Sequence, residues 1–283
     1  WKPWSWKIED CLMVFLLITL SLLVLLLTVY LFAIRGRKGH PGLQALKGWS
    51  YAHRGLHSEG IPENSMAAFA AAKNAGYGVE LDVHLLADGN LAVIHDSNLE
   101  RVTGKLGIVE DLTLPQLQDH YLCGTEEVIP EFSQVLNLFA GQVPLIVELK
   151  THEKNHKQLC KAVCDMMASY PGAYCLESFD PRCILWLRKH RPLLVRGQLN
   201  EDYLAKKDSK IPWILRWLMT ENLTNFITKP DFVAYRFQDR HCTLSNYFCL
   251  RRMACVTWTI TSQEDYDQAK TEGWIPIFEG FRP

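Results

Sequence analysis

The sequence lacks several features that would direct it toward nucleic acids, zinc or dinucleotides. Its 30 Lys and Arg residues almost balance its 31 Asp and Glu residues, and the formal net charge of -1 gives no basic field for binding nucleic acid. Its nine cysteines include no CxxC pair. That pattern fits reduced thiols in a reducing compartment better than a zinc site or a disulfide framework. No Gly-rich dinucleotide loop is present either.

One long stretch, residues 11–34, contains no charged residue and consists mainly of Leu, Val, Ile and Phe. As a helix it would be about 36 Å long, enough to cross a hydrocarbon core of about 30 Å. The alternatives are a cleaved signal peptide, whose apolar region is usually shorter, and a buried core helix, which is rarely so uniformly apolar. We therefore predict a single transmembrane helix at 11–34, preceded by an N-terminal flank at 1–10.

The charges on either side of this segment predict its orientation. The linker at 35–48 carries four basic residues and no acidic one, whereas the flank at 1–10 balances two Lys with one Glu and one Asp. Because positive flanks tend to stay inside, we expect the part that follows on the cytoplasmic side of a single-pass membrane protein.

From Trp49 onward, short apolar runs alternate with helical patterns, which predicts a parallel sheet. The expected strands are Trp49–His53, Gly78–Val83, Leu91–His95, Leu145–Lys150, Ala173–Ser178, Leu193–Gln198, Asp231–Tyr235, Ala254–Thr259 and Trp274–Phe278. About eight strand-helix units over residues 49–283 match the length of a (β/α)8 TIM barrel. The fold class is therefore α/β, with a doubly wound open sheet as the alternative.

Helix boundaries in this region carry their own signals. The pattern at Glu63–Ala75 ends at Gly76, a residue type that often follows a helix. Asp180-Pro181 provides a capping residue followed by a proline at the first helical position. Ser262 and Asp265 resemble a capping box, and Gly273 closes the helix that follows.

Two stretches interrupt the rhythm. Residues of about 97–131 form an insertion with an expected short helix after Pro115. The apolar stretch 211–219 is too short to span a membrane. It is either a barrel helix packed on the sheet or an interfacial helix that contacts the bilayer.

Polar residues gather at the predicted strand ends, where TIM barrels place their active sites. Glu80 and Asp82 are two apart, and so are Glu148 and Lys150, so each pair shares one face of its strand. Buried carboxylates must be neutralised, and a divalent cation such as Mg²⁺ or Ca²⁺ does so with the least strain. His53-Arg54 and His95-Asp96 follow two further strands.

These residues stand in an order and spacing that resembles the glycerophosphodiester phosphodiesterase family. The matching motifs are His53-Arg54-Gly55, Glu63-Asn64-Ser65, Glu80-x-Asp82, His95-Asp96, Arg101-x-Thr103-Gly104 and Glu148-x-Lys150. The resemblance implies a TIM barrel with a small insertion. It implies one divalent cation, Mg²⁺ or Ca²⁺, held by Glu80, Asp82 and Glu148, a phosphate bound by Arg54 and Lys150, and general acid/base catalysis by His53 and His95.

Two further residues are weaker candidates. Asn64 is either a helix cap or a partner of a catalytic group that binds substrate. Trp258 matches a pocket position and would give the glycerol or acyl moiety a flat apolar wall.

The expected reaction is hydrolysis of a glycerophosphodiester to an alcohol and glycerol 3-phosphate. Lysophospholipids, cleaved to lysophosphatidic acid in the manner of a lysophospholipase D, are the other substrate class, and the bilayer would be the second partner. A phospholipase of the phosphatidylinositol-specific C or sphingomyelinase D type is an alternative enzyme. A non-catalytic, membrane-tethered lipid-binding barrel is an alternative outside enzymes. The complete Glu80, Asp82 and Glu148 set favours the first interpretation.

Overall fold

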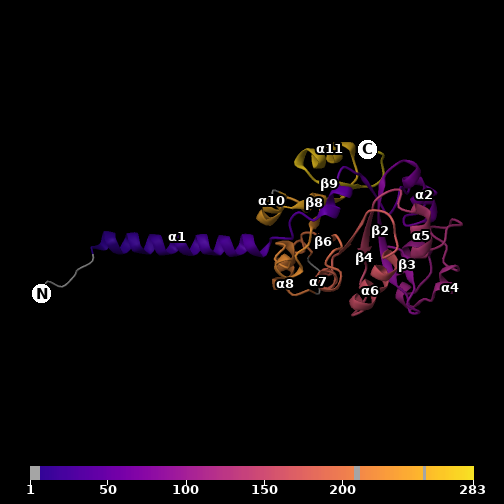
Figure 1. Cartoon of the computed structure of the whole chain (residues 1–283), viewed down its shortest axis with the longest axis horizontal. Helices are drawn as coiled ribbons and strands as arrows, with labels where there is room; N and C mark the ends of the chain where they lie inside the picture. The colour runs from indigo at the N-terminus through magenta and orange to yellow at the C-terminus, as the bar shows by residue number, and fades with distance from the viewer. Residues whose placement is uncertain (1–6, 207–210, 251–252) are drawn as a thin grey trace.

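The computed structural model describes residues 7–206, 211–250 and 253–283, so most of the flank at 1–10 lies outside it. Eight parallel strands form a closed barrel in the order β1-β9-β8-β7-β6-β5-β4-β2, and β1 pairs with β2 to complete it (Figure 1). The predicted TIM barrel is therefore confirmed. The short strand β3 runs antiparallel to β2 and extends the sheet beyond the barrel. The strands are β1 Tyr51–His53, β2 Gly78–Leu85, β3 Leu91–Val93, β4 Leu145–Leu149, β5 Tyr174–Ser178, β6 Arg196–Asn200, β7 Phe232–Arg236, β8 Ala254–Ile260 and β9 Ile275–Phe278.

One predicted strand is displaced. The expected strand Leu193–Gln198 begins instead at Arg196, because Leu193 is exposed and the Leu194 amide donates to the Arg191 carbonyl in a turn. Leu193 and Leu194 thus belong to the turn after a helix, whereas Val195 is buried in the core and its carbonyl accepts from the Leu176 amide of β5.

Helices cover the outside of the barrel. They are α2 Met66–Asn74, α5 Phe132–Phe139, α6 His156–Met167, α7 Pro181–His190, α8 Trp213–Thr220, α9 Asn225–Thr228, α10 Leu244–Leu250 and α11 Gln263–Glu272. Asp180 and Ser262 cap α7 and α11 as predicted, each accepting a hydrogen bond from a backbone amide of the first turn. Helix α2 begins at Met66, later than predicted, because Ser65 is its N-cap and accepts from the Ala68 amide at 3.1 Å.

The main core lies between the sheet and these helices, where Phe69 and Phe139 meet edge to face. A second cluster fills the barrel near the N-terminal ends of the strands. The linker supplies its last layer through the short helix η1, Pro41–Ala45, which brings Leu43 and Leu46 against the strand residues Tyr51 and Phe232. The linker is therefore packed against the bottom of the barrel, which its sequence did not predict.

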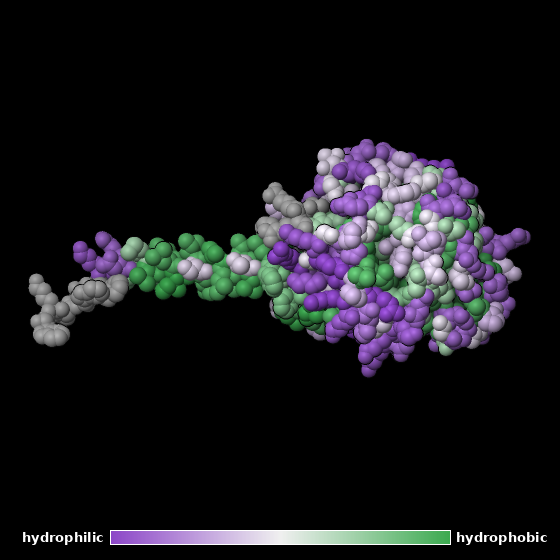
Figure 2. Space-filling model, in the orientation of Figure 1, coloured by the Kyte–Doolittle hydropathy of each residue, from purple (hydrophilic) through white to green (hydrophobic). Residues whose placement is uncertain are grey.

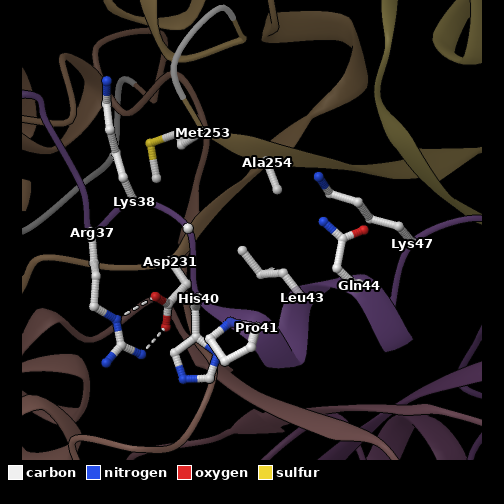
Figure 3. A pocket seen from close by; sticks show the side chains of 11 residues that line it. Arg37, Lys38, His40, Pro41, Leu43, Gln44, Lys47, Asp231, Met253 and Ala254 are labelled. Carbon is white, nitrogen blue, oxygen red and sulfur yellow. Dashed lines mark hydrogen bonds and ion pairs between the residues drawn. The ribbon is translucent and has the colours of Figure 1, made fainter.

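Figure 3 shows a pocket of about 340 Å³ between this linker and the starts of β7 and β8. Arg37 and Asp231 lie at one edge of this pocket, where the Arg37 Nη2 donates to Asp231 Oδ2 at 2.6 Å. Because it lies at the starts of the strands, this pocket is at the opposite end of the barrel from the residues predicted to react.

The insertion has a small core of its own. It contains α3 Glu100–Thr103, η2 Val109–Asp111 and α4 Leu114–Leu117. Leu99, Val102 and Val109 pack there against Leu86 and Ile94, which flank the β2–β3 hairpin. The insertion is thereby fixed to the strand that carries Glu80 and Asp82.

The structure describes the side chains of eight of the nine cysteines, and none of these eight forms a disulfide. Five are buried: Cys160, Cys164, Cys175, Cys183 and Cys255. Burial raises the pKa of Cys164 to about 12, so its thiol stays protonated. These thiols behave as small core residues, in keeping with the predicted reduced state.

Helix α1, Ile8–Ala33, extends away from the barrel and has no buried residue (Figure 1). It has 26 residues, and an 18-residue window within it has a mean hydropathy of 3.0, so it is long and apolar enough to cross a membrane, although a signal sequence near an N-terminus meets the same criterion. Figure 2 shows a nearly continuous hydrophobic surface along it. The helix starts at Ile8, three residues before the predicted start at Cys11, and ends at Ala33, one residue before the predicted end at Ile34.

Candidate active site

The barrel brings together the acidic residues that the sequence placed on shared strand faces. In the sheet, His53 pairs with Glu80 and Asp82 pairs with Glu148, so the ends of β1, β2 and β4 lie side by side. Glu80, Asp82 and Glu148 are all buried, and one oxygen from each lies within 4.8 Å of the others. This group can hold a cation.

Burial and mutual repulsion shift the ionisation of these acids. Burial, with the charges of Asp82 and Glu148, raises the pKa of Glu80 well above its usual range. Burial raises the pKa of Glu148 to about 7 against the opposing charge of Lys150. Burial also disfavours ionised Asp82, but Lys150, His95 and Arg54 outweigh it and hold its pKa below its usual range. Asp82 is therefore ionised at neutral pH, and added positive charge would favour the ionised forms of Glu80 and Glu148.

Two cations flank the acids. The Lys150 ammonium lies 3.1 Å from Asp82 Oδ1 and 2.8 Å from Glu148 Oε1. The Arg54 Nε lies 3.5 Å from Asp82 Oδ2, and its Nη1 donates to Glu63 at 2.9 Å. Arg54 has a φ of 54°, which turns the chain so that its backbone amide donates to Glu80. Both cations are therefore placed to bind an anion at the edge of the acidic group.

Asn64 has its side chain in this group and does not cap α2. Its Nδ2 donates to Asp82 Oδ2 at 2.8 Å, and its φ of 53° lies in the left-handed region. Its buried Oδ1 has no hydrogen-bond partner in the described part of the chain. A buried amide oxygen without a donor costs free energy, so this oxygen is suited to a ligand. Substrate binding by Asn64 stays a prediction.

Each of the two predicted histidines is held by a carboxylate at Nδ1. The His53 Nδ1 is hydrogen-bonded to Glu279, and its Nε2 lies 3.9 Å from Glu80 Oε2. The His95 Nδ1 lies 2.6 Å from Asp96 Oδ1. With Nδ1 engaged in both rings, Nε2 is the nitrogen that exchanges protons.

Burial sets the charge of both rings. It lowers the pKa of His53, although Glu279 opposes the shift. Burial also lowers the pKa of His95 to about 4, against the raising effect of Asp82. Both rings are thus neutral at neutral pH in this state, as a general base requires.

Further contacts hold the second histidine in place. Arg101 pairs with Asp96 and also with Glu63, at 2.6 Å from Nη2 to Oε1. The neighbouring His84 hydrogen-bonds the His95 carbonyl at 3.2 Å and Glu110 of the insertion at 2.6 Å. The insertion thereby positions His95. The Arg101 motif was visible in the sequence, but its part in this network was not.

Two acidic residues at the site escaped the sequence prediction. Glu279 follows β9 and reaches His53 only because β9 pairs with β1 when the barrel closes. Glu177 lies opposite Glu148 on β5 and is 1% exposed. Burial, together with the charges of Glu148 and Asp82, raises the pKa of Glu177 well above its usual range. Its position at the end of a buried strand was the signal that would have found it.

Trp258 stands on β8, half-buried. Its ring meets Phe179 edge to face with centroids 5.4 Å apart, and its Nε1 donates to the Ala234 carbonyl at 3.3 Å. Its role as a pocket wall stays a prediction.

Comparisons with known proteins agree with this geometry. The model of the "Glycerophosphoryl diester phosphodiesterase family" matches residues 53–278. The human protein "Glycerophosphodiester phosphodiesterase 1" is 40% identical over 250 residues, which cover 76% of this chain and 72% of that protein. A "Glycerophosphodiester phosphodiesterase" of Caldanaerobacter subterraneus subsp. tengcongensis is 48% identical over 174 residues, 57% of this chain and 68% of that protein.

Among solved structures, a phosphodiesterase of Oleispira antarctica in complex with the product sn-glycerol-3-phosphate superimposes with a TM-score of 0.69. It is 20% identical in sequence, and the match covers 83% of this chain and 94% of that chain. A glycerophosphodiester phosphodiesterase of Thermotoga maritima gives a TM-score of 0.62 at 21% identity, over 81% of this chain and 93% of that one. At this identity the two likenesses establish the fold.

Proposed function

The chain belongs to the glycerophosphoryl diester phosphodiesterase family and is a phosphoric diester hydrolase, and we propose that it acts through a divalent cation and two histidines. Its substrates are glycerophosphodiesters, which it splits into an alcohol and glycerol 3-phosphate. The observation that carries this proposal is the meeting, at one barrel mouth, of three carboxylates within 4.8 Å of one another with two cations and two carboxylate-bound imidazoles.

The acids suit a hard cation. Glu80, Asp82 and Glu148 offer only oxygen donors, which are the ligands that Mg²⁺ and Ca²⁺ prefer. The raised pKa values of Glu80 and Glu148 support the assignment, because they report negative charge that the side chains present do not neutralise. A bound divalent cation would stabilise the negative charge that grows on the phosphate oxygens during the reaction. Which of the two ions is used depends on ligand number and site size.

Arg54 and Lys150 bind the phosphate. Both cations are half-buried, and their contacts with Asp82 and Glu148 fix them at the edge of the acidic group. A phosphodiester entering beside them exchanges its hydration for these fixed charges. Preorganised cations stabilise the transition state more than water does, since they need no reorientation as charge develops.

His53 and His95 move the protons. In the first step, one imidazole takes the proton of the substrate's own glycerol hydroxyl, whose oxygen attacks phosphorus. The other imidazole protonates the leaving alcohol, which leaves a cyclic phosphate. In the second step a water molecule gives up its proton and opens the ring, and the displaced glycerol oxygen is protonated. Both rings are neutral before binding, so the acid acquires its proton when the phosphate anion arrives and raises its pKa.

Helix α1 anchors the enzyme in a membrane as a single-pass span. Its length, the mean hydropathy of 3.0 over an 18-residue window and its lack of buried residues support this role. The basic linker that follows supports a cytoplasmic position for the barrel. We divide the chain accordingly into the flank at 1–10, the span at 11–34, the linker at 35–48 and the catalytic barrel at 49–283.

Lysophospholipids are the second substrate class, favoured by the anchor, which would hold the barrel beside a bilayer. Cleavage on the head-group side of the phosphate would release lysophosphatidic acid. The non-catalytic alternative is disfavoured, because neither a predicted metal ligand nor a predicted histidine is missing from the site.

The test is hydrolysis by the detergent-solubilised full chain of glycerophosphocholine, glycerophosphoethanolamine and lysophosphatidylcholine, with EDTA and then with Mg²⁺ or Ca²⁺ added back. We expect metal-dependent release of choline or ethanolamine. His53→Ala and His95→Ala should each reduce turnover by about 100-fold or more. The control is His190→Ala, at the end of α7 and far from the mouth. Near-normal turnover by both histidine variants would refute the two-histidine mechanism.

A further inference from the structure

The outer wall beside α1 exposes large apolar side chains. Helix α8 buries only Thr220, and the short helix α9 follows it along the same wall. Trp213 is 65% exposed and Ile227 is 54% exposed. We call this surface the collar; it consists of Trp213, Ile214, Leu215, Trp217, Phe226 and Ile227. Packing on the barrel, one of the two roles considered for residues 211–219, therefore does not account for these side chains. A contiguous exposed patch of this kind marks an interaction surface.

The collar is continuous with the end of α1. Phe32 of α1 meets Phe226 edge to face with centroids 6.0 Å apart. The Tyr30 hydroxyl donates to Glu221 at 2.6 Å, just after α8, and Asn225 donates to the Ile34 carbonyl at 3.0 Å. Figure 1 shows α8 next to the point where α1 meets the barrel domain. Figure 2 shows hydrophobic surface continuing from α1 onto the barrel domain there.

These contacts fix the depth of the collar. If α1 spans a bilayer, its last turn ends at the boundary between hydrocarbon and head groups. Phe226 touches that last turn, so the α9 end of the collar lies at the same boundary. Trp residues favour this zone, where the ring is in apolar surroundings and the indole N–H reaches water.

Basic residues border the same surface. The Lys229 ammonium lies 4.8 Å from the centre of the Phe32 ring and donates to the Arg35 carbonyl at 3.0 Å. Arg188 of α7 donates to the Ile227 carbonyl. Apolar side chains flanked by cations are the combination that binds interfacial helices to membranes containing anionic lipids.

We propose that the collar inserts into the surface of the bilayer that α1 spans and holds the barrel against it. The inference rests on the proposed anchor, since continuity with α1 is what selects lipid over a second protein as the occupant. It extends the proposed function, because a barrel docked on lipid through α8 and α9 would work beside the membrane surface where lysophospholipids lie.

The test uses the full chain reconstituted into vesicles of phosphatidylcholine and phosphatidylglycerol that contain a clickable phosphatidylcholine. A photoreactive p-benzoylphenylalanine replaces Ile214 in one variant and Leu106 in the control; Leu106 lies in the insertion and is 82% exposed. We expect lipid crosslinking at 214 to exceed that at 106 by at least fivefold. Equal crosslinking at the two positions, or crosslinking of 214 to a second protein chain, would overturn the proposal.

A functional experiment separates this inference from the proposed activity. Trp213→Ser combined with Phe226→Ser should leave turnover of soluble glycerophosphocholine within twofold of wild type and reduce turnover of lysophosphatidylcholine in vesicles by about tenfold. Leu106→Ser is the matched control. Equal loss on both substrates would contradict docking. If the wild-type chain hydrolysed neither substrate, the proposed function would be refuted. The crosslinking experiment would still decide whether the collar contacts lipid. Extraction of the chain at alkaline pH would refute the anchor itself.

Discussion

The barrel mouth and the wall beside α1 depart from the usual distribution of side chains in opposite directions. The mouth buries acids, with Glu80, Asp82, Glu148 and Glu177 all shielded from solvent. The wall exposes apolar side chains, among them Trp213 and others of the collar. Each arrangement costs free energy in water. Buried carboxylates lose their favourable hydration, and exposed apolar side chains keep an unfavourable contact with water. We therefore infer that each region binds a partner that offsets this cost.

The helix α11 provides the reference for an ordinary outer surface. It also lies on the outside of the barrel, but its exposed positions are polar or charged, including Glu264, Asp267 and Lys270. α8 occupies a similar layer with the opposite surface chemistry. What distinguishes the two is their distance from α1, because α8 and the adjoining α9 meet its last turn.

The largest expected effect is at the mouth, where we expect the buried carboxylates to contribute to activity and not to stability. Glu148→Gln should reduce turnover by at least about 1,000-fold, because it removes a metal ligand. In EDTA the same variant should be more stable than wild type above pH 7, by about 3 kcal/mol. The control is Glu264→Gln on α11, which should change neither quantity.

The pH dependence of that stability follows from the pKa of Glu148, which burial raises to about 7. An acid whose pKa is raised by folding stabilises the protein fully below its unfolded value, and this contribution is lost as the pH rises toward 7. The difference in unfolding free energy between Glu148→Gln and wild type should therefore grow from about pH 4.5 to pH 7. A variant less stable than wild type at pH 8 would show that the carboxylate serves the fold.

An intermediate effect is expected for Glu279, which touches His53 and not the acids. Its carboxylate raises the pKa of His53 against the effect of burial. Glu279→Gln should therefore lower that pKa and move the acid limb of the kcat/KM profile to lower pH. Turnover should fall on the order of 10- to 100-fold. An unchanged pH profile would show that Glu279 does not set the pKa of His53 during catalysis.

The smallest effect is expected at the wall. Trp213→Ser, measured by thermal unfolding of the detergent-solubilised chain, should change stability by no more than about 0.5 kcal/mol, because an exposed side chain contributes little packing. Phe69→Ala in the core should cost about 3–5 kcal/mol. A large loss on changing Trp213 would mean that its ring packs in the folded protein, and the contrast between wall and core would fail.

The sequence predicted the strands and the main site residues because both follow from local rules. A parallel strand buried on both faces is a short apolar run, and carboxylates two residues apart share one face wherever the strand lies. This is why Glu80, Asp82 and Glu148 could be grouped before the fold was known. Helix ends at Ser262 and Asp180 were predictable for the same reason.

What the sequence missed depends on closure of the barrel or on backbone shape. Glu279 reaches His53 only across the β1–β9 pair, which joins the two ends of the barrel. The sequence left Asn64 open between a helix cap and a partner of the site; it precedes the N-cap Ser65 with a φ of 53°, and its side chain donates to Asp82. The exposure of α8 was left open, since apolar residues at helical spacing are compatible with a core and with a membrane surface alike.

The measurement that tests the central claim most directly is calorimetric titration of the EDTA-stripped full chain with Mg²⁺ and Ca²⁺, for wild type and for Asp82→Asn. Glycerophosphocholine hydrolysis is measured on the same samples. We expect about one ion per chain in wild type, recovery of turnover in step with binding, and loss of both in Asp82→Asn with its circular dichroism unchanged. Full turnover by stripped wild-type protein, or unaltered binding by Asp82→Asn, would contradict a metal centre formed by Glu80, Asp82 and Glu148.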